Sequence, residues 1–391
     1  MNDRRSFYFL WVSQMMSNGG DVLYIVGLIQ LVYVSSGSVL TLTLIPLTIT
    51  FSRLVGSYLT PLLLHRFPLR QILLFSMVGK IIVLSGVFLC KEESILWILI
   101  LVSVIAFLDG WATPIRQAML PELVGKSELP KANSLVAISD NTINLVSWPI
   151  GAFFVALYSG GTLLLVSIGL YMFAWMLTYG IKAIPHIKKD VQSVFQQLSG
   201  GWKYSFSIKP IRNILLLDTL TAFAGAVWIS AILYVYVDEV IEKSTAWWGY
   251  INAFYSGGFL IGGYLFAKLM KIPAHLMIGV GCFLTSLLTV WFLFPFYALM
   301  ALVISLFLGV FGQLQLIAQL TLLQMHTDTN QLGHVFSVQS VLVTGSFGIA
   351  TFIFGLTAEW FGINHAFYLS AVVMVVSGLF TIKQRKTFYY A

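Results

Sequence analysis

The segment ILWILILVSVIAFLDGWAT, which runs from Ile95 to Thr113, decides the fold class of this chain. It is almost entirely apolar, and about 20 helical residues are enough to cross the roughly 30 Å hydrocarbon core of a bilayer. Eleven further apolar runs predict an all-α integral membrane protein with twelve transmembrane helices. The predicted spans are 7–33, 39–64, 69–89, 95–113, 131–157, 162–183, 210–237, 245–267, 274–294, 296–324, 333–357 and 364–382.

The distribution of positive charge orients these spans. Hydrophobic residues make up 58% of the chain and charged residues 9%, whereas soluble domains carry roughly 25% charged residues. With a cytoplasmic N-terminus, eighteen of the 22 Lys and Arg residues fall in inward segments, and Lys91 and Lys243 fall in outward ones. The positive-inside rule then places both termini in the cytoplasm, and the net charge of +7 requires no nucleic-acid partner. We expect a multi-pass protein of a bacterial cell membrane.

The sequence gives no support for a cofactor, a metal centre or an enzyme. Cys90 and Cys282 lie in or beside different spans, which indicates packing rather than a disulfide or a metal site. The chain contains neither a GxxxxGK[ST] phosphate-binding motif nor an HExxH metal motif. We therefore predict a non-enzymatic membrane protein without cofactors or metals.

The chain divides into two similar halves. Val55–Leu59 in the second span is echoed by Ile261–Leu265 in the eighth, as in parallel repeats that hold a substrate near the membrane midplane. We predict an N-terminal six-helix bundle over 1–183 and a C-terminal six-helix bundle over 210–391. The polar interval 184–209 has apolar residues at helical spacing, which predicts an amphipathic helix along the cytoplasmic surface.

Several short motifs resemble those of a known family. They are Thr113-Pro114, Leu120–Val124, Leu129, Ala132–Leu135 and Trp148–Gly151 in the first half, and Leu332–Ser337 and Phe361–His365 in the second. On these motifs the chain resembles, over nearly its whole length, the major facilitator superfamily. Within it, the chain is similar to the drug and proton antiporter group that includes macrolide-efflux proteins and the enterobactin exporter. The resemblance implies the major facilitator fold and says little about the substrate.

Pro149 and Gly151 match the antiporter motif of the family's fifth helix, although Trp148 stands where a glycine is usual. A small residue permits close helix approach, and a proline removes one backbone hydrogen bond and permits bending. The resemblance therefore implies a gating role for Pro149 and Gly151, with packing that Trp148 alters.

The loop after the second span contains His65, Arg66 and Arg70 but lacks the Asp that the family usually places before its basic residues. In the family this loop is thought to latch the outward-facing state. Arg66 and Arg70 then belong either to a latch that is weaker or depends on His65 protonation, or to ordinary positive-inside anchors. Both interpretations stay open at this point.

Five charged residues lie well inside the spans of the first half, namely Asp21, Arg53, Lys80, Asp109 and Asp140. Each costs about 2.5 to 3.5 kcal/mol at a helix centre, so such residues are expected to face a cavity or one another. The three carboxylates are candidates for proton coupling or substrate contact. Arg53 and Lys80 are candidate charge partners for them.

Asp21 is the strongest of these candidates because Gln14, Asn18 and Asp21 share one helical face and form a polar stripe. A carboxylate on a water-facing stripe could load and release protons. The alternative is a structural ion pair with Arg53 or Lys80.

Asp140 and Asn144 share a face of the fifth span, which predicts a second cavity-facing stripe. Asp109, Thr113 and Arg116 share a face that leads toward the cytoplasm. For Asp109, an ion pair with the nearby cytoplasmic loop competes with a coupling role.

The second half offers uncharged polar and aromatic side chains, which suit bulky amphipathic substrates but are also common at lipid interfaces. The candidates for a cavity wall are Gln315, Gln319, Gln339, Trp228, Tyr234 and Tyr255.

Together with the resemblance, these features predict a monomeric secondary active transporter whose partners are a small-molecule substrate, protons and the lipid bilayer. The expected activity is proton-coupled efflux of lipophilic or amphipathic compounds, as in multidrug resistance, by alternating access. One alternative is a dedicated exporter of a siderophore or another endogenous metabolite. A third possibility, from another class, is a membrane receptor or assembly partner that transports nothing.

Overall fold

Apolar helices account for the regular structure of this chain. The computed structural model describes residues 4–36, 39–64, 66–89, 95–182, 194–228, 232–233, 236–237, 240–242, 246–294 and 298–388, and within these ranges every regular element is helical. The long helices are α1 (Arg4–Ser36), α2 (Val39–Leu64), α3 (Leu69–Leu89), α4 (Ile95–Val124), α5 (Leu129–Leu157), α6 (Gly160–Tyr179), α7 (Val194–Ser207), α8 (Lys209–Gly225), α10 (Ala246–Leu269), α11 (Ala274–Phe292), α12 (Ala298–His326), α13 (Leu332–Phe361) and α14 (Ile363–Lys383).

Every long helix except α7 coincides with one of the twelve predicted spans, which confirms the all-α membrane fold. Within the described ranges, eight helices are long and apolar enough to cross a bilayer on length and composition alone. The helix α7 lies in the predicted linker. Residues 183–193 of that linker fall outside the described ranges.

Two predicted boundaries differ from the structure by ten residues or more. The fourth span was expected to end at Thr113, but α4 continues to Val124 through Pro114 and Pro121. A proline costs backbone hydrogen bonding, yet the apolar face of α4 stays buried beyond it, at Ile115 and Met119 among others. Burial of that face explains why the helix persists.

The seventh span was expected to be one helix over 210–237. Instead α8 ends at Gly225 and is followed by the short 3-10 helix η2 (Ala226–Trp228). Trp228 packs its ring against Phe292 and Phe367, at centroid distances of 5.0 and 5.2 Å.

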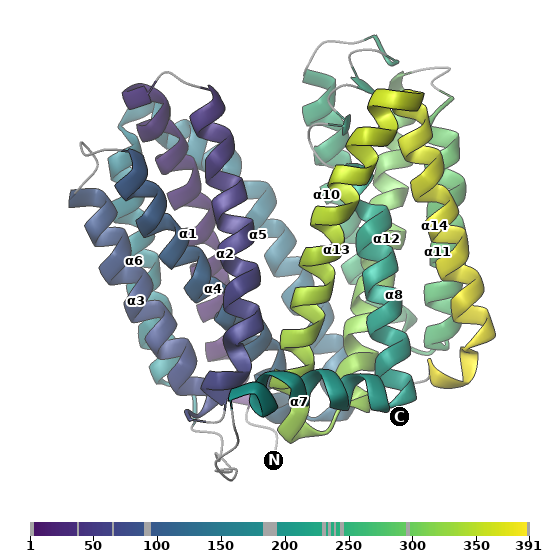
Figure 1. The fold of residues 1–391 in the computed structure, drawn as a ribbon, viewed down its shortest axis with the longest axis horizontal. Helices are drawn as coiled ribbons and strands as arrows, with labels where there is room; N and C mark the ends of the chain where they lie inside the picture. Colours follow the sequence, from purple (N-terminus) through teal and green to yellow (C-terminus); the bar gives the residue numbers. More distant parts are fainter. Residues whose placement is uncertain are drawn as a thin grey trace. The chain divides into compact units, whose positions relative to one another are not determined.

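Contacts divide the chain into two units, of which unit 1 comprises Met1–Ser127, Thr142–Tyr204 and Asp328–Val341. In this unit α1 packs along α6, α2 along α4, and α3 against both α4 and α6 (Figure 1). Close approach of α1 and α6 depends on Gly27, where an added Cβ would lie 2.7 Å from the Gly160 carbonyl oxygen. Ser57 on α2 donates a 2.9 Å hydrogen bond to the Gly110 carbonyl on α4. Missing side chains at these glycines let the helices touch through their backbones.

Unit 2 comprises Glu128–Asn141, Ser205–Thr327 and Leu342–Ala391. Here α10 packs along α12, and α11 against α12 and α14. An aromatic core holds the unit together: the Tyr236 ring lies 5.1 Å from Phe292 and 5.0 Å from Phe367, and its hydroxyl donates a 2.7 Å hydrogen bond to the Phe292 carbonyl.

The helices α5 and α13 each contribute to both units. In the first part of α5, the Asn133 amide donates to Thr321 Oγ1 at 2.9 Å and to Gln324 Oε1 at 2.6 Å, all within unit 2. In the first part of α13, Ser337 donates to the Ser57 carbonyl within unit 1. Backbone contact thus groups the chain differently from its linear halves, and the bundles 1–183 and 210–391 stay a prediction about repeats.

The linker helix α7 is anchored by a side-chain contact within unit 1. Tyr204 donates a 2.9 Å hydrogen bond to Asp328 Oδ2, and its oxygen accepts from the Asp328 backbone N–H at 3.2 Å. Partial burial raises the pKa of the Tyr204 hydroxyl above its ordinary value, so this donor keeps its proton at neutral pH.

Candidate functional site

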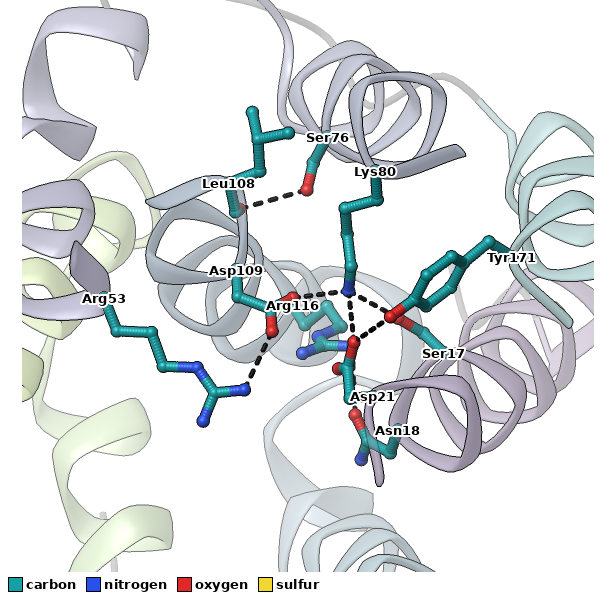
Figure 2. Close-up of polar contacts among 10 residues, drawn as sticks. All are labelled: Ser17, Asn18, Asp21, Arg53, Ser76, Lys80, Leu108, Asp109, Arg116 and Tyr171. Carbon is teal, nitrogen blue, oxygen red and sulfur yellow. Dashed lines mark hydrogen bonds and ion pairs between the residues drawn. The ribbon is translucent and has the colours of Figure 1, made fainter. Parts of the chain in front are cut away.

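Lys80 is the centre of a charged cluster in unit 1. It lies in the middle of the apolar helix α3, and only 1% of its side chain is exposed. Its ammonium Nζ lies 2.7 Å from Asp21 Oδ1 on α1 and 2.5 Å from Asp109 Oδ1 on α4 (Figure 2). An isolated ammonium cannot be buried at this depth without a large desolvation cost. The two carboxylates supply the compensation.

Asp109 is held by cations at both oxygens. Oδ1 contacts Lys80, and Oδ2 accepts a 2.9 Å hydrogen bond from Arg53 Nη2 on α2. The Asp109 side chain is 5% exposed, whereas that of Arg53 is 42% exposed. Arg53 is therefore the exposed end of the cluster, and Asp109 is a buried, doubly paired carboxylate.

Asp21 is held differently, because its partners converge on one oxygen. Lys80 and the hydroxyl of Tyr171 on α6 both contact Oδ1, the hydroxyl at 2.5 Å. Among the described residues, no hydrogen bond reaches Oδ2, and 12% of the Asp21 side chain is exposed. Ser17, one turn before Asp21, lies 3.4 Å from the Lys80 ammonium. The two carboxylates of the cluster are thus chemically unequal.

Helix packing explains how five helices reach one point. Each carboxylate has a glycine neighbour in sequence: Gly20 precedes Asp21, and Gly110 follows Asp109. An added Cβ at Gly20 would lie 2.9 Å from the Tyr171 ring, and one at Gly110 would lie 2.8 Å from the backbone N of Ser57. These glycines let α6 and α2 come close enough for their side chains to reach the carboxylates.

The partners of Asp109 differ from one expectation. An ion pair near the cytoplasmic loop was a predicted alternative, but the structure pairs Asp109 with Arg53 and Lys80. Arg116, one of the residues on the same face of α4, is buried and donates a 3.4 Å hydrogen bond to Asn18 Oδ1 on α1. Asn18 therefore belongs to the margin of the cluster.

The remaining polar candidates of the first half are placed on their helices as follows. Gln14 is half-buried on α1; on α5, Asp140 is half-buried within unit 2, and Asn144 is exposed within unit 1. The contacts described above join none of these three to Lys80, so their coupling or substrate roles stay predictions.

Among the gating candidates, Gly151 on α5 packs against α1, since an added Cβ would lie 3.1 Å from Val26. Pro149 lies within α5, and its side chain falls outside the described part. Arg66 is exposed; Arg70 on α3 donates to the Tyr179 carbonyl of α6, and its guanidinium lies 5.1 Å from that ring.

In unit 2, Gln315 on α12 forms two hydrogen bonds to side chains of α11. Its Nε2 donates to Thr285 Oγ1 on α11 at 3.1 Å, and Cys282 Sγ donates to its Oε1 at 3.3 Å. Gln319 is buried on α12, with its Nε2 atom unpaired in the described structure. A third buried glutamine, Gln313, has neither amide atom hydrogen-bonded there.

Two of the other candidates for a cavity wall, Trp228 and Tyr255, pack against aromatic rings. Trp228 belongs to the aromatic core described above. Tyr255 on α10 packs against Phe259, with ring centroids 4.9 Å apart. Gln339 is half-buried on α13, and Tyr234 lies outside the described residues.

Sequence reasoning missed Tyr171, which is fully buried on α6. A single tyrosine in an apolar span carries no distinctive pattern, because tyrosine is common in spans and at membrane interfaces. The only accompanying signal is Gly20 beside Asp21, which indicates a close neighbour but does not identify it.

Comparisons with known proteins were made on the whole chain. The model of the Major Facilitator Superfamily matches residues 10–351. The uncharacterized MFS-type transporter YfmI of Bacillus subtilis (strain 168) is 26% identical, over 97% of this chain and 96% of the relative. Macrolide efflux protein A of Streptococcus pyogenes is 22% identical, over 96% of this chain and 94% of the relative.

Solved structures share the fold at low sequence identity. A bacterial homologue of the iron transporter ferroportin in an outward-facing state superposes with a TM-score of 0.81 at 13% identity, over 97% of this chain and 99% of the other. The E. coli fucose:proton symporter gives a TM-score of 0.79 at 14% identity, over 96% and 98% of the two chains. At these identities the likeness establishes the fold alone.

Proposed function

Because the chain belongs to the Major Facilitator Superfamily and is therefore a membrane transporter of small molecules, we propose that it couples proton entry to the export of lipophilic or amphipathic compounds. The observation that carries this proposal is the inequality of the two carboxylates at Lys80. Asp109 has a cation on each oxygen, whereas Asp21 keeps one oxygen to which no described residue donates. Asp21 is thus the site at which a proton can be added with least disruption.

Protonation of Asp21 would change the charge balance at Lys80. In the described state the ammonium is shared between Asp21 and Asp109. A neutral Asp21 attracts the ammonium less, so Lys80 would move toward Asp109 and loosen α1 from α3. Such a change in helix contacts is how proton binding would bias one transport state over another. Alternating access by rocking of the two predicted bundles completes the proposed cycle.

The direction and the substrate class rest on similarity. Macrolide efflux protein A is a distant relative that covers nearly the whole chain. Its name favours export of bulky amphipathic molecules, and the antiporter motif at Pro149 and Gly151 favours exchange with protons. A dedicated exporter of an endogenous metabolite would share the same cluster and is distinguished by experiment.

The test of this proposal is transport by the Asp21→Asn variant in proteoliposomes. Ethidium and erythromycin serve as probes, with and without a pH gradient. We expect the gradient-driven part of transport to fall at least about tenfold, which corresponds to about 1.4 kcal/mol, because Asn cannot take a proton. Exchange of the probe without a pH gradient should persist.

Glu359→Gln is the matched control, because it removes an exposed acid from α13 and should leave transport unchanged. Full gradient-driven transport by Asp21→Asn would contradict the proposed coupling. If wild-type protein moved neither probe, the medium of a deletion strain, analysed for secreted metabolites, would identify an endogenous substrate. If the protein moved neither probe and the deletion strain secreted the same metabolites as wild type, the receptor alternative would be favoured.

A further inference from the structure

Tyr171 contacts both charged partners of the proposed proton site. Its hydroxyl donates a 2.5 Å hydrogen bond to Asp21 Oδ1, and its ring lies under the ammonium of Lys80, with Nζ 4.4 Å from the ring centroid. The side chain is fully buried. A phenol can therefore act here in two ways, as a hydrogen-bond donor to the carboxylate and as a cation–π partner of the ammonium.

Two donors, the Tyr171 hydroxyl and the Lys80 ammonium, meet at one oxygen of Asp21. Oδ1 accepts from Tyr171 and lies 2.7 Å from the Lys80 ammonium, whereas Oδ2 has no hydrogen bond within the described residues. Figure 2 shows both dashed contacts meeting on the same oxygen. A proton arriving at Asp21 would meet two donors at Oδ1 and none at Oδ2.

The backbone of α1 is shaped to admit this ring. At Gly20 an added Cβ would lie 2.9 Å from Tyr171 Cε1, so any larger residue would push the ring away. A second side-chain contact keeps α1 and α6 together: Ser13 and Thr178 share a 2.7 Å hydrogen bond. The position of Tyr171 thus depends on packing along the α1–α6 interface and not on the charges alone.

We infer that Tyr171 is the positioning residue of the proton site: it fixes Asp21 Oδ1 against Lys80 and leaves Oδ2 as the atom that takes the proton. This inference rests on the proposed function, since it assumes that Asp21 is the group that is protonated. Because the hydroxyl stabilises the ionised carboxylate by a charge-assisted hydrogen bond, it also sets the pH range in which the site works. The titratable and charged groups that interact with Asp21 are Tyr24 on its own helix and Arg53, Lys80, Asp109 and Tyr171 on the neighbouring helices of unit 1; Arg116 contacts Asn18, one turn before Asp21.

The experiment is an infrared titration of the wild-type protein and its variants in liposomes. The carboxyl band of protonated Asp21 is identified as the band that Asp21→Asn removes. In Tyr171→Phe the ring stays beneath Lys80 but the donor is lost, so the midpoint of this band should move to higher pH by about one unit. The pH profile of gradient-driven transport should move in the same direction.

Two further variants separate positioning from general damage. Tyr158→Phe removes an exposed hydroxyl in unit 1 and should leave the titration unchanged. Tyr171→Leu removes the ring as well, and its midpoint should move at least as far as that of Tyr171→Phe. The thermal midpoint of Tyr171→Phe should stay within a few degrees of wild type.

An unshifted midpoint in Tyr171→Phe, or the lack of any titrating band that Asp21→Asn removes, would overturn the inference. The two proposals fail separately. If Asp21→Asn loses gradient-driven transport while Tyr171→Phe titrates as wild type, only the role of Tyr171 is wrong. If Asp21→Asn keeps gradient-driven transport, the proposed coupling itself is wrong.

Discussion

Replacing Lys80 with Met is expected to lower the free energy of unfolding by about 3–5 kcal/mol at neutral pH, the range for a buried ion pair that loses one partner. The variant leaves Asp21 and Asp109 buried beside each other, with Arg53 as the remaining cation in direct contact. Thermal denaturation of the purified protein in detergent, monitored by the loss of monodisperse protein, measures the effect.

If the lower stability of Lys80→Met comes from the carboxylates that lose their cation, removing one of them should restore stability. Lys80→Met combined with Asp21→Asn should recover much of the stability, because the repelling carboxylate is gone. Lowering the pH from about 7.5 to about 5 should also reduce the difference in stability between Lys80→Met and wild type, since added protons neutralise buried carboxylates. Lys268→Met is the control: this exposed lysine rests on Tyr264, with Nζ 4.5 Å from the ring centroid. The assigned ion pairs would be contradicted if the stability difference between Lys80→Met and wild type did not change with pH and was not reduced by Asp21→Asn.

Gly258→Val is expected to destabilise unit 2 by at least about 3 kcal/mol, the upper part of the range for overpacked cores. An added Cβ at Gly258 on α10 would overlap the Leu306 carbonyl oxygen of α12, and one at Gly309 on α12 would overlap the Tyr255 carbonyl oxygen of α10. Both obstructing atoms are backbone, which cannot rotate away. The thermal midpoint and the yield of monodisperse protein report the change.

The matched control for this variant is Gly169→Val on α6, because an added Cβ there meets no atom within 4 Å. It carries the same change in helix propensity, which is slightly favourable because valine is a better helix former than glycine, without the steric overlap. Equal destabilisation by the two substitutions would show that the close α10–α12 contact is not responsible for the effect.

The fold was predictable because the bilayer requires long apolar helices, and such runs are visible without any knowledge of contacts. The end of α4 was not predictable from the sequence, since Pro114 and Pro121 indicate a break only when no buried face continues past them. The break in the seventh span at Gly225 was missed for a related reason. Trp228 and its aromatic neighbours are apolar, so hydropathy does not distinguish a continuous helix from a turn that packs in a core.

The candidate site was predictable only in part. Charges inside spans identified Asp21, Arg53, Lys80 and Asp109 as residues that must find partners. Which cation meets which oxygen depends on distances between helices, and these are set by glycines such as Gly20 that give no directional signal in the sequence. Gln315 illustrates the same limit, because its partners on α11 are fixed by helix rotation rather than by spacing along α12.

The four ion-paired side chains Arg53, Asp109, Lys80 and Asp21 alternate in sign and sum to zero charge when both acids are ionised. A single proton on Asp21 makes that sum +1. A membrane voltage does no work on a neutral group but contributes about 2.3 kcal/mol per 100 mV for each elementary charge carried across the bilayer. For this cluster, the electric field would therefore favour one direction of movement in the protonated form and leave the unprotonated form indifferent.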